Sequence, residues 1–203
     1  MSDIANRRPL RSRGTGWATA LARVLLKTWL TPNAVSIAGI GFAAAGAICF
    51  ALAPCWPVLW FGGALAVQLR LLANLMDGLL AVEGGRKSAT GALYNEFPDR
   101  IEDTLLLVAA GYGAGVPTLG WAAALAAMGT AYVRALGGAI GLAQDFRGPM
   151  AKQHRMALLT IGAVASLALP VMPWVLAMIC AGAMLTCARR LAHQAHALTE
   201  AAR

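Results

Sequence analysis

Six long, predominantly apolar stretches limit what this chain of 203 residues can fold into. They cover about 34–53, 57–81, 91–113, 117–143, 153–170 and 173–188. A helix crosses a bilayer with roughly 20 consecutive apolar residues, so each stretch is close to the length of one span. Charged residues make up only 13% of the chain, whereas soluble domains contain about 25%. The sequence therefore predicts an all-α membrane protein with six transmembrane helices.

Basic residues mark every second connection between these stretches. They are Arg7, Arg8, Arg11, Arg13, Arg23 and Lys27 before the first, Arg86 and Lys87 after the second, Arg147, Lys152 and Arg155 after the fourth, and Arg189 and Arg190 after the sixth. Because cationic loops stay on the cytoplasmic side, we predict a multi-pass protein of a bacterial-type inner (cytoplasmic) membrane with both termini in the cytoplasm. The aromatic belt expected at the outer interface consists of Trp56, Trp60, Trp121 and Trp174.

The N-terminal segment 1–32 is predicted to stay outside the membrane core. Apolar residues recur there at helical spacing, at Trp17, Leu21, Val24, Leu25 and Trp29. This pattern indicates an amphipathic helix in the membrane interface, and an unstructured charged leader is the alternative. We expect a single integral membrane domain over 1–203, with a six-helix core at 33–190 and a cytoplasmic tail at 191–203. The net charge of +8 lies beside membrane segments, so it predicts contacts with membrane lipids and no nucleic-acid partner.

Polar residues collect in one segment, 74–103, at the predicted cytoplasmic ends of the second and third spans. Two sets each share one face of a helix, namely Asn74 with Asp77, and Gly91 with Asn95, Asp99 and Asp103. Oxygen ligands from two neighbouring helices suit a hard cation such as Mg²⁺. Gly78 and Ala81 continue the first face almost without side chains, which leaves room for a ligand. The alternative is that these residues cap helix ends and face the cytoplasm.

This spacing resembles the motif of the CDP-alcohol phosphotransferases, Asp-x2-Asp-Gly-x2-Ala-Arg-x8-Gly-x3-Asp-x3-Asp. The chain reads Asn74-x2-Asp77-Gly78-x2-Ala81-Val82-x8-Gly91-x3-Asn95-x3-Asp99 in the same register, and Thr31-Pro32-Asn33 is similar to the family's Thr-Pro-Asn sequence. The resemblance implies a CDP-alcohol phosphatidyltransferase of phospholipid biosynthesis. Such an enzyme transfers a phosphatidyl group, a substituted phosphate, from a CDP-alcohol such as CDP-diacylglycerol to a small hydroxyl acceptor and releases CMP.

The resemblance also implies roles for individual residues. Asp77 and Asp99 become catalytic residues, and Asp99 is the base for the incoming hydroxyl. The metal ligands are Asn74, Asp77, Asn95 and Asp99, and the nucleotide site consists of Gly78, Ala81, Gly91 and, in place of the family's Arg at Val82, Arg86 or Lys87. In the family four carboxylates hold two divalent ions. Two of them are Asn in this chain, so either one Mg²⁺ or Mn²⁺ ion binds, or Glu96, Glu102 or Asp103 restores the charge, with Asp103 best placed.

A second basic element, Arg147 to Arg155, precedes the fifth stretch. Lys152 and Arg155 lie three residues apart and suit a phosphate group, which favours an anionic acceptor such as glycerol 3-phosphate or inositol phosphate. Arg134 interrupts the fourth stretch and is predicted to find a partner in Asp77 or Asp99 while also serving the acceptor. Arg70 is expected to extend toward the interface or to donate to the Asn74 amide.

Two other functions compete with this one. A catalytically reduced relative would bind lipid or nucleotide, or stabilise a partner enzyme, and the changes at Asn74, Asn95 and Val82 motivate that hypothesis. A small transporter is disfavoured because the polar residues lie at one membrane face and not at the midplane. For assembly, a homodimer is an open alternative to a monomer.

Overall fold

Seven helices make up the part of the chain that the structure describes. The computed structural model describes residues 15–28, 30–83, 85 and 90–201, except for the side chains of Glu83, Ala92 and Asn95. The helices are α1 (Gly16–Leu26), α2 (Pro32–Leu52), α3 (Leu59–Glu83), α4 (Gly91–Gly113), α5 (Pro117–Ala139), α6 (Lys152–Ala165) and α7 (Met172–Ala201). No strand occurs within those described residues, so the predicted all-α class is confirmed.

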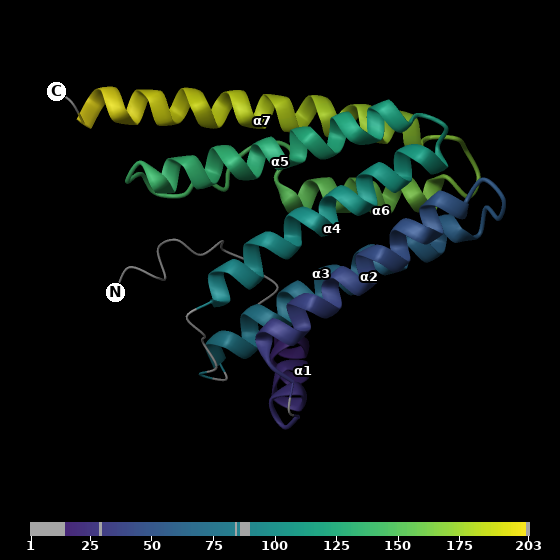
Figure 1. The fold of residues 1–203 in the computed structure, drawn as a ribbon, viewed down its shortest axis with the longest axis horizontal. Coiled ribbons are helices and arrows are strands. Elements are labelled where there is room, and N and C mark those ends of the chain that lie inside the picture. Colours follow the sequence, from purple (N-terminus) through teal and green to yellow (C-terminus); the bar gives the residue numbers. More distant parts are fainter. Residues whose placement is uncertain (1–14, 29, 84, 86–89, 202–203) are drawn as a thin grey trace.

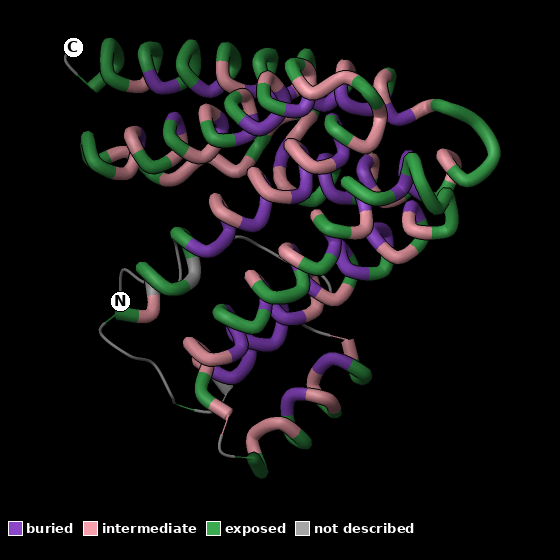
Figure 2. Tube along the Cα trace, turned by 45° about the vertical axis from the view of Figure 1, so that its right-hand side comes forward, coloured by how far each residue is buried: buried purple, intermediate pink, exposed green. Residues whose placement is uncertain are grey.

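Helices α2 to α7 run side by side, and α1 lies across one end of the α2 and α3 pair (Figure 1). The α2–α3, α4–α5 and α6–α7 turns all lie at the right-hand end in Figure 1, and the end of α3, the start of α4 and the end of α7 lie toward the other end. These three turns are those whose sequence contains glycine or proline but no charge. Burial increases toward the middle of the bundle, where the helices pack against one another (Figure 2).

Local sequence explains where several helices begin. The Thr31 hydroxyl accepts a hydrogen bond from the Ala34 amide at 3.2 Å, which caps α2. Pro32 and Pro117 occupy the first positions of α2 and α5, where a missing N–H costs nothing. These boundaries lie close to the predicted starts at 34 and 117.

Glycines set the closest helix contacts. A Cβ added to Gly111 of α4 would lie 2.7 Å from the Gly120 Cα of α5, and one added to Gly46 of α2 would lie 2.9 Å from the Ala66 Cβ of α3. Small residues promote association in lipid because they let backbones approach closely. Through these contacts α3 and α4, which contain the polar segment, are held in one block with α2 and α5.

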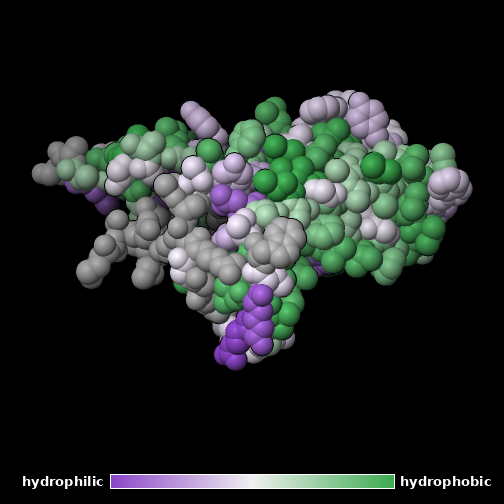
Figure 3. Space-filling view, turned by 60° about the horizontal axis from the view of Figure 1, so that its bottom comes forward, coloured by the Kyte–Doolittle hydropathy of each residue, from purple (hydrophilic) through white to green (hydrophobic). Residues whose placement is uncertain are grey.

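Four helices, α2, α3, α5 and α7, are long and apolar enough to cross a membrane. Helix α4 has 23 residues but contains several charges, and α6 has only 14 residues and ends at Ala165, short of the predicted 170. Large apolar side chains such as Leu125 and Trp174 are 74% exposed. An apolar surface also covers much of the bundle, while hydrophilic atoms gather where α1 projects (Figure 3). A membrane protein is thus indicated, and six spans remain a prediction.

The expectation for one tryptophan is corrected, and the N-terminal helix keeps its predicted interfacial position as a prediction. Trp60 is 7% exposed and packs against Phe50 at 5.5 Å between ring centroids, so its placement in an outer belt is wrong. Helix α1 is present. Its Ala18 and Ala22 pack against α3, while Trp17 and Val24 are exposed. The predicted interfacial helix therefore packs on the very turns of α3 that precede and follow Asp77.

Candidate active site

Polar side chains from four helices converge at the polar end of α3 and α4. Helix α3 provides Arg70, Asn74 and Asp77 at intervals of four and three, and α4 provides Asp99, Glu102 and Asp103 at intervals of three and one. Ser36 comes from α2, and the first turn of α6 adds Lys152 and Arg155. The sequence predicted that the α3 and α4 faces would meet, and they do. It missed the contribution of Ser36 and the ion pair between Arg70 and Glu102.

Asp77 is held by a serine on α2. The Ser36 hydroxyl donates to Asp77 Oδ2 at 2.6 Å, and Asp77 is only 4% exposed. Its other oxygen, Oδ1, is buried and has no hydrogen-bond partner among the described residues. Buried polar atoms are nearly always paired, and Glu102 Oε1 is likewise buried without a partner among the described residues, so both carboxylate oxygens are candidates to bind a further group.

Asp99 receives several nitrogen donors. Asn74 Nδ2 donates to Asp99 Oδ1 at 2.5 Å, and the Lys152 ammonium forms an ion pair with the same oxygen. On the other oxygen, Oδ2, the Arg100 guanidinium lies at 3.5 Å. Asn74 Nδ2 also lies 3.4 Å from Glu102 Oε2. Two carboxylates therefore fix the orientation of the Asn74 amide, with its nitrogen toward them.

A buried network of ion pairs lies next to Asn74 and Asp99. Arg70 is 0% exposed; its Nε binds Glu102, and its Nη2 lies 2.5 Å from Asp103 Oδ1. Arg155 Nη2 lies 2.5 Å from Asp103 Oδ2 and is also buried. The expectation that Arg70 extends to the interface or donates to Asn74 is wrong, because two acids on α4 surround it.

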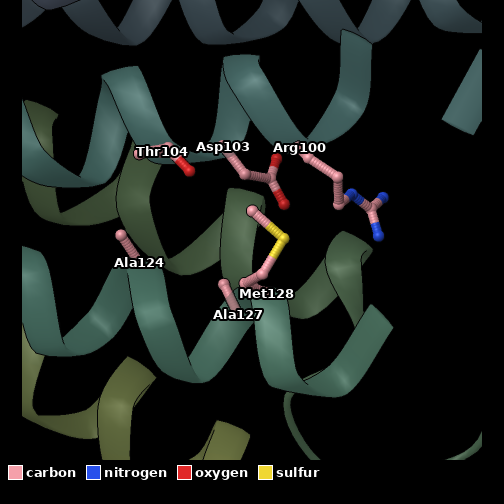
Figure 4. A pocket seen from close by; sticks show the side chains of 6 residues that line it. All are labelled: Arg100, Asp103, Thr104, Ala124, Ala127 and Met128. Carbon is pink, nitrogen blue, oxygen red and sulfur yellow. The ribbon is translucent and has the colours of Figure 1, made fainter. Parts of the chain in front are cut away.

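Asp103 uses both of its carboxylate oxygens in this network. That arrangement argues against its predicted role as an additional metal ligand, because two guanidinium groups already neutralise it. Figure 4 shows Asp103 turned toward Met128, beside a small pocket between α4 and α5. The pocket is lined by Arg100, Asp103, Thr104, Ala124, Ala127 and Met128.

Comparisons with known proteins identify the family of this chain. The phosphatidylinositol phosphate synthase of Mycolicibacterium smegmatis is 30% identical over 164 residues, covering 77% of this chain and 72% of the relative. That of Mycobacterium marinum is 32% identical over 187 residues, covering 84% and 76%. The chain belongs to the CDP-alcohol phosphotransferase family. Family membership makes it a phosphatidyltransferase of phospholipid biosynthesis, which uses a CDP-activated lipid and an alcohol acceptor. No family model matches the chain.

Solved structures of the family share the fold. The crystal structure of Mycobacterium tuberculosis phosphatidylinositol phosphate synthase with CDP-DAG bound has a TM-score of 0.75 at 25% identity, covering 87% of this chain and 92% of that chain. A second structure of the same protein, in complex with manganese and citrate, also has a TM-score of 0.75 and covers 88% of that chain. A divalent metal is therefore supported for the family site.

This chain offers a divalent ion fewer acid ligands than the family motif does. Among the described residues, no group of three or more His, Cys, Asp or Glu side chains is arranged to hold a metal. The free buried oxygen of Asp77 fits an ion, and Asp99 lies on the facing helix. The orientation of Asn74, nitrogen toward Asp99, argues against its predicted role as a ligand. The side chain of Asn95 lies outside what the structure describes.

The remaining predicted site residues differ in exposure and in their contacts. Gly78, Ala81 and Gly91 are half-buried, and Val82, in the position of the family's Arg, is 45% exposed. Arg86 and Lys87 lie outside the described residues. Arg134 pairs with Glu96 and donates to Gln144 at 3.0 Å, so the prediction that Asp77 or Asp99 is its partner is wrong.

The connection before α6 is hydrogen-bonded to α7. Arg190 Nε donates to the Arg147 carbonyl at 2.8 Å, and its Nη1 donates to the Thr130 carbonyl at 2.7 Å. Within the connection, the Arg147 amide and Nε both donate to Asp145 Oδ1, at 2.9 and 3.0 Å. Burial opposes the ionisation of Asp145, but these hydrogen bonds and the Arg147 charge outweigh it and lower the pKa of Asp145. Sequence analysis assigned Arg190 only to charge flanking, and no local signal distinguishes it.

Proposed function

We propose that this chain transfers the phosphatidyl group of CDP-diacylglycerol to a phosphorylated polyol, with inositol phosphate as the leading acceptor. The observation that carries the proposal is the free, buried Asp77 oxygen, which lies in the family motif beside Asp99. The relatives named above support inositol phosphate over glycerol 3-phosphate. The donor and the reaction type follow from the family, so the proposal concerns the acceptor and the residues.

Asp77 and Asp99, with Asn95, are the proposed ligands of a Mg²⁺ or Mn²⁺ ion. When bound, such an ion neutralises charge on the donor's pyrophosphate and on the departing CMP. Asp99 Oδ2 is the oxygen proposed to take the proton of the acceptor hydroxyl, because Oδ1 already receives Asn74 and Lys152. Ser36 holds Asp77 so that its free oxygen keeps one direction.

The proposed nucleotide site consists of Gly78, Ala81, Gly91 and Arg86, in the register of the family motif. Small residues on the α3 face let the donor lie against the backbone. For the acceptor phosphate we propose Lys152 and Arg134, whose side chains keep 17% and 12% of their surface accessible. Arg155 is proposed to act indirectly, by supporting Lys152. Its Nη1 donates to the Met150 carbonyl at 3.3 Å, which supports the turn before Lys152.

CMP release from the purified protein tests the proposed function. With Mg²⁺ and CDP-diacylglycerol in detergent, we expect release with inositol 1-phosphate and little release with inositol, glycerol or no acceptor. Glycerol 3-phosphate as the best acceptor would correct the substrate and keep the reaction. A folded protein that binds CDP and releases no CMP with any acceptor would instead support a catalytically reduced relative.

We further propose six membrane crossings, with both termini on the cytoplasmic side of an inner membrane. The arrangement of turns at alternate ends of the bundle supports this topology. In a variant lacking the four native cysteines, an impermeant thiol reagent applied to intact cells should label Gly115→Cys and Val171→Cys but not Lys87→Cys. Labelling at Lys87→Cys without cell lysis would overturn the topology. The predicted homodimer stays a prediction, and light scattering of the detergent-solubilised protein tests it.

A further inference from the structure

Two side chains of this chain, Asn74 and Lys152, contact one oxygen of Asp99, the last acid of the family motif. Asp99 Oδ1 accepts from Asn74 Nδ2 at 2.5 Å and is paired with the Lys152 ammonium. Arg70 Nη2 lies 3.6 Å from the same oxygen. Two hydrogen-bond donors therefore occupy Asp99 Oδ1, with the Arg70 charge close by, and of the two carboxylate oxygens only Oδ2 stays available to an ion or a proton.

The Asn74 amide cannot supply the missing ligand in this arrangement. Its nitrogen faces two acceptors, Asp99 Oδ1 and Glu102 Oε2, while its oxygen faces α2, 3.5 Å from where a Gly39 Cβ would lie. Turning the amide over would place its oxygen against two carboxylates. The substitution of Asn for the family's Asp at position 74 therefore removes a charge and also replaces an oxygen ligand with a hydrogen-bond donor.

The charge of the buried cluster leads to the same conclusion. Its acids, Asp77, Asp99, Glu102 and Asp103, sum to −4, and its bases, Arg70, Arg100, Lys152 and Arg155, sum to +4, so the net charge is 0. A second divalent ion would raise the cluster from +2 to +4 in a poorly solvated place, where like charges repel strongly. One divalent ion at the free Asp77 oxygen leaves +2, which attracts the pyrophosphate of the donor.

We infer that Lys152, which shares Asp99 Oδ1 with Asn74, is a built-in cation that takes the place of one of the two divalent ions, so the chain binds a single ion at Asp77. This inference rests on the proposed function for the identity of the site. It adds a charge-balancing role at Asp99 to the proposed contact of Lys152 with the acceptor phosphate, and it explains how a site with Asn at the first motif position compensates the charge of Asp99.

The test measures how many Mn²⁺ ions each chain binds. Mn²⁺ is titrated into the purified protein in detergent, and bound ion is measured from the loss of the electron paramagnetic resonance signal of free Mn²⁺. Wild type should bind one Mn²⁺ per chain at saturation, with and without CDP. Two ions bound to the wild type, or none, would overturn the inference.

A set of variants identifies the cause. Combining Asn74→Asp, Asn95→Asp and Lys152→Met restores four motif acids and removes the ammonium, and this variant should bind two Mn²⁺. Its matched control carries both Asp changes with Lys152→Arg, which keeps the cation, and should bind one. If the two variants bind equal numbers of ions, Lys152 does not replace an ion. If neither folds, as judged by circular dichroism, the wild-type count decides alone. CMP release is scored separately, so one bound ion without turnover would defeat the proposed function and leave this inference standing.

Discussion

Replacing Asp77 by Asn is expected to lower the rate of CMP release about 1,000-fold, equivalent to about 4 kcal/mol of transition-state stabilisation. The substitution keeps the shape of the side chain and lets the new amide oxygen accept from Ser36, but it removes the charge that the free oxygen offers to an ion. Initial rates with CDP-diacylglycerol and inositol 1-phosphate, measured over a range of Mg²⁺ concentrations, test this expectation.

Stability distinguishes this catalytic role from a structural one. A buried charge with one unpaired oxygen is costly to the fold, so Asp77→Asn should leave the thermal unfolding midpoint unchanged or raise it. Glu200→Gln, at an exposed acid near the end of α7, is the control and should alter neither rate nor midpoint. If Asp77→Asn keeps more than a tenth of the wild-type rate, Asp77 is not the residue on which the site depends.

Replacing Arg70 by Met is expected to destabilise the protein by about 3–5 kcal/mol, because it leaves Glu102 without its ion pair in the core. A loss of that size is a large fraction of the stability of a typical protein. The measurement is the free energy of unfolding in mixed micelles, from denaturant titrations followed by tryptophan fluorescence.

Two comparisons sharpen the Arg70 experiment. Arg70→Met combined with Glu102→Met should recover most of the loss, because apolar residues can replace a buried ion pair at little cost. Arg134→Met removes the partner of Glu96, whose side chain is 51% exposed, and should cost less than about 1 kcal/mol. Equal losses for Arg70→Met and Arg134→Met would mean that the buried network does not stabilise this fold.

Ser36 illustrates a contact that no local pattern could reveal. It lies one turn after Pro32, on a helix that reads as uniformly apolar apart from Asn33 and Ser36 itself. Its partner Asp77 is 41 positions away in the sequence. A serine in an apolar helix usually bonds its own backbone, and Ser36 does so with the Pro32 carbonyl at 3.2 Å. Only the approach of α2 to α3 adds Asp77 to that arrangement.

The sequence by itself determined the class of the fold, the places where the helices begin and the motif around Asp77 and Asp99. Each of these depends on short-range chemistry. Apolar length decides whether a segment suits lipid, proline and glycine decide where a helix stops, and fixed spacing decides which residues share a face. The same rules placed the end of α6 at about 170, beyond its actual end at Ala165. The reason is that no proline or charge marks the residues near Ser166, where the helix ends.

Only the tertiary structure decided which charges meet. Arg70 binds Glu102 across 32 positions, and Lys152 binds Asp99 across 53. Several acids on α4 were equally available by sequence spacing, so the choice depended on how α3, α4 and α6 pack. Because a buried charge is tolerated only with a partner, that packing determined which acids became neutralised by arginine and left Asp77 with an oxygen free to bind.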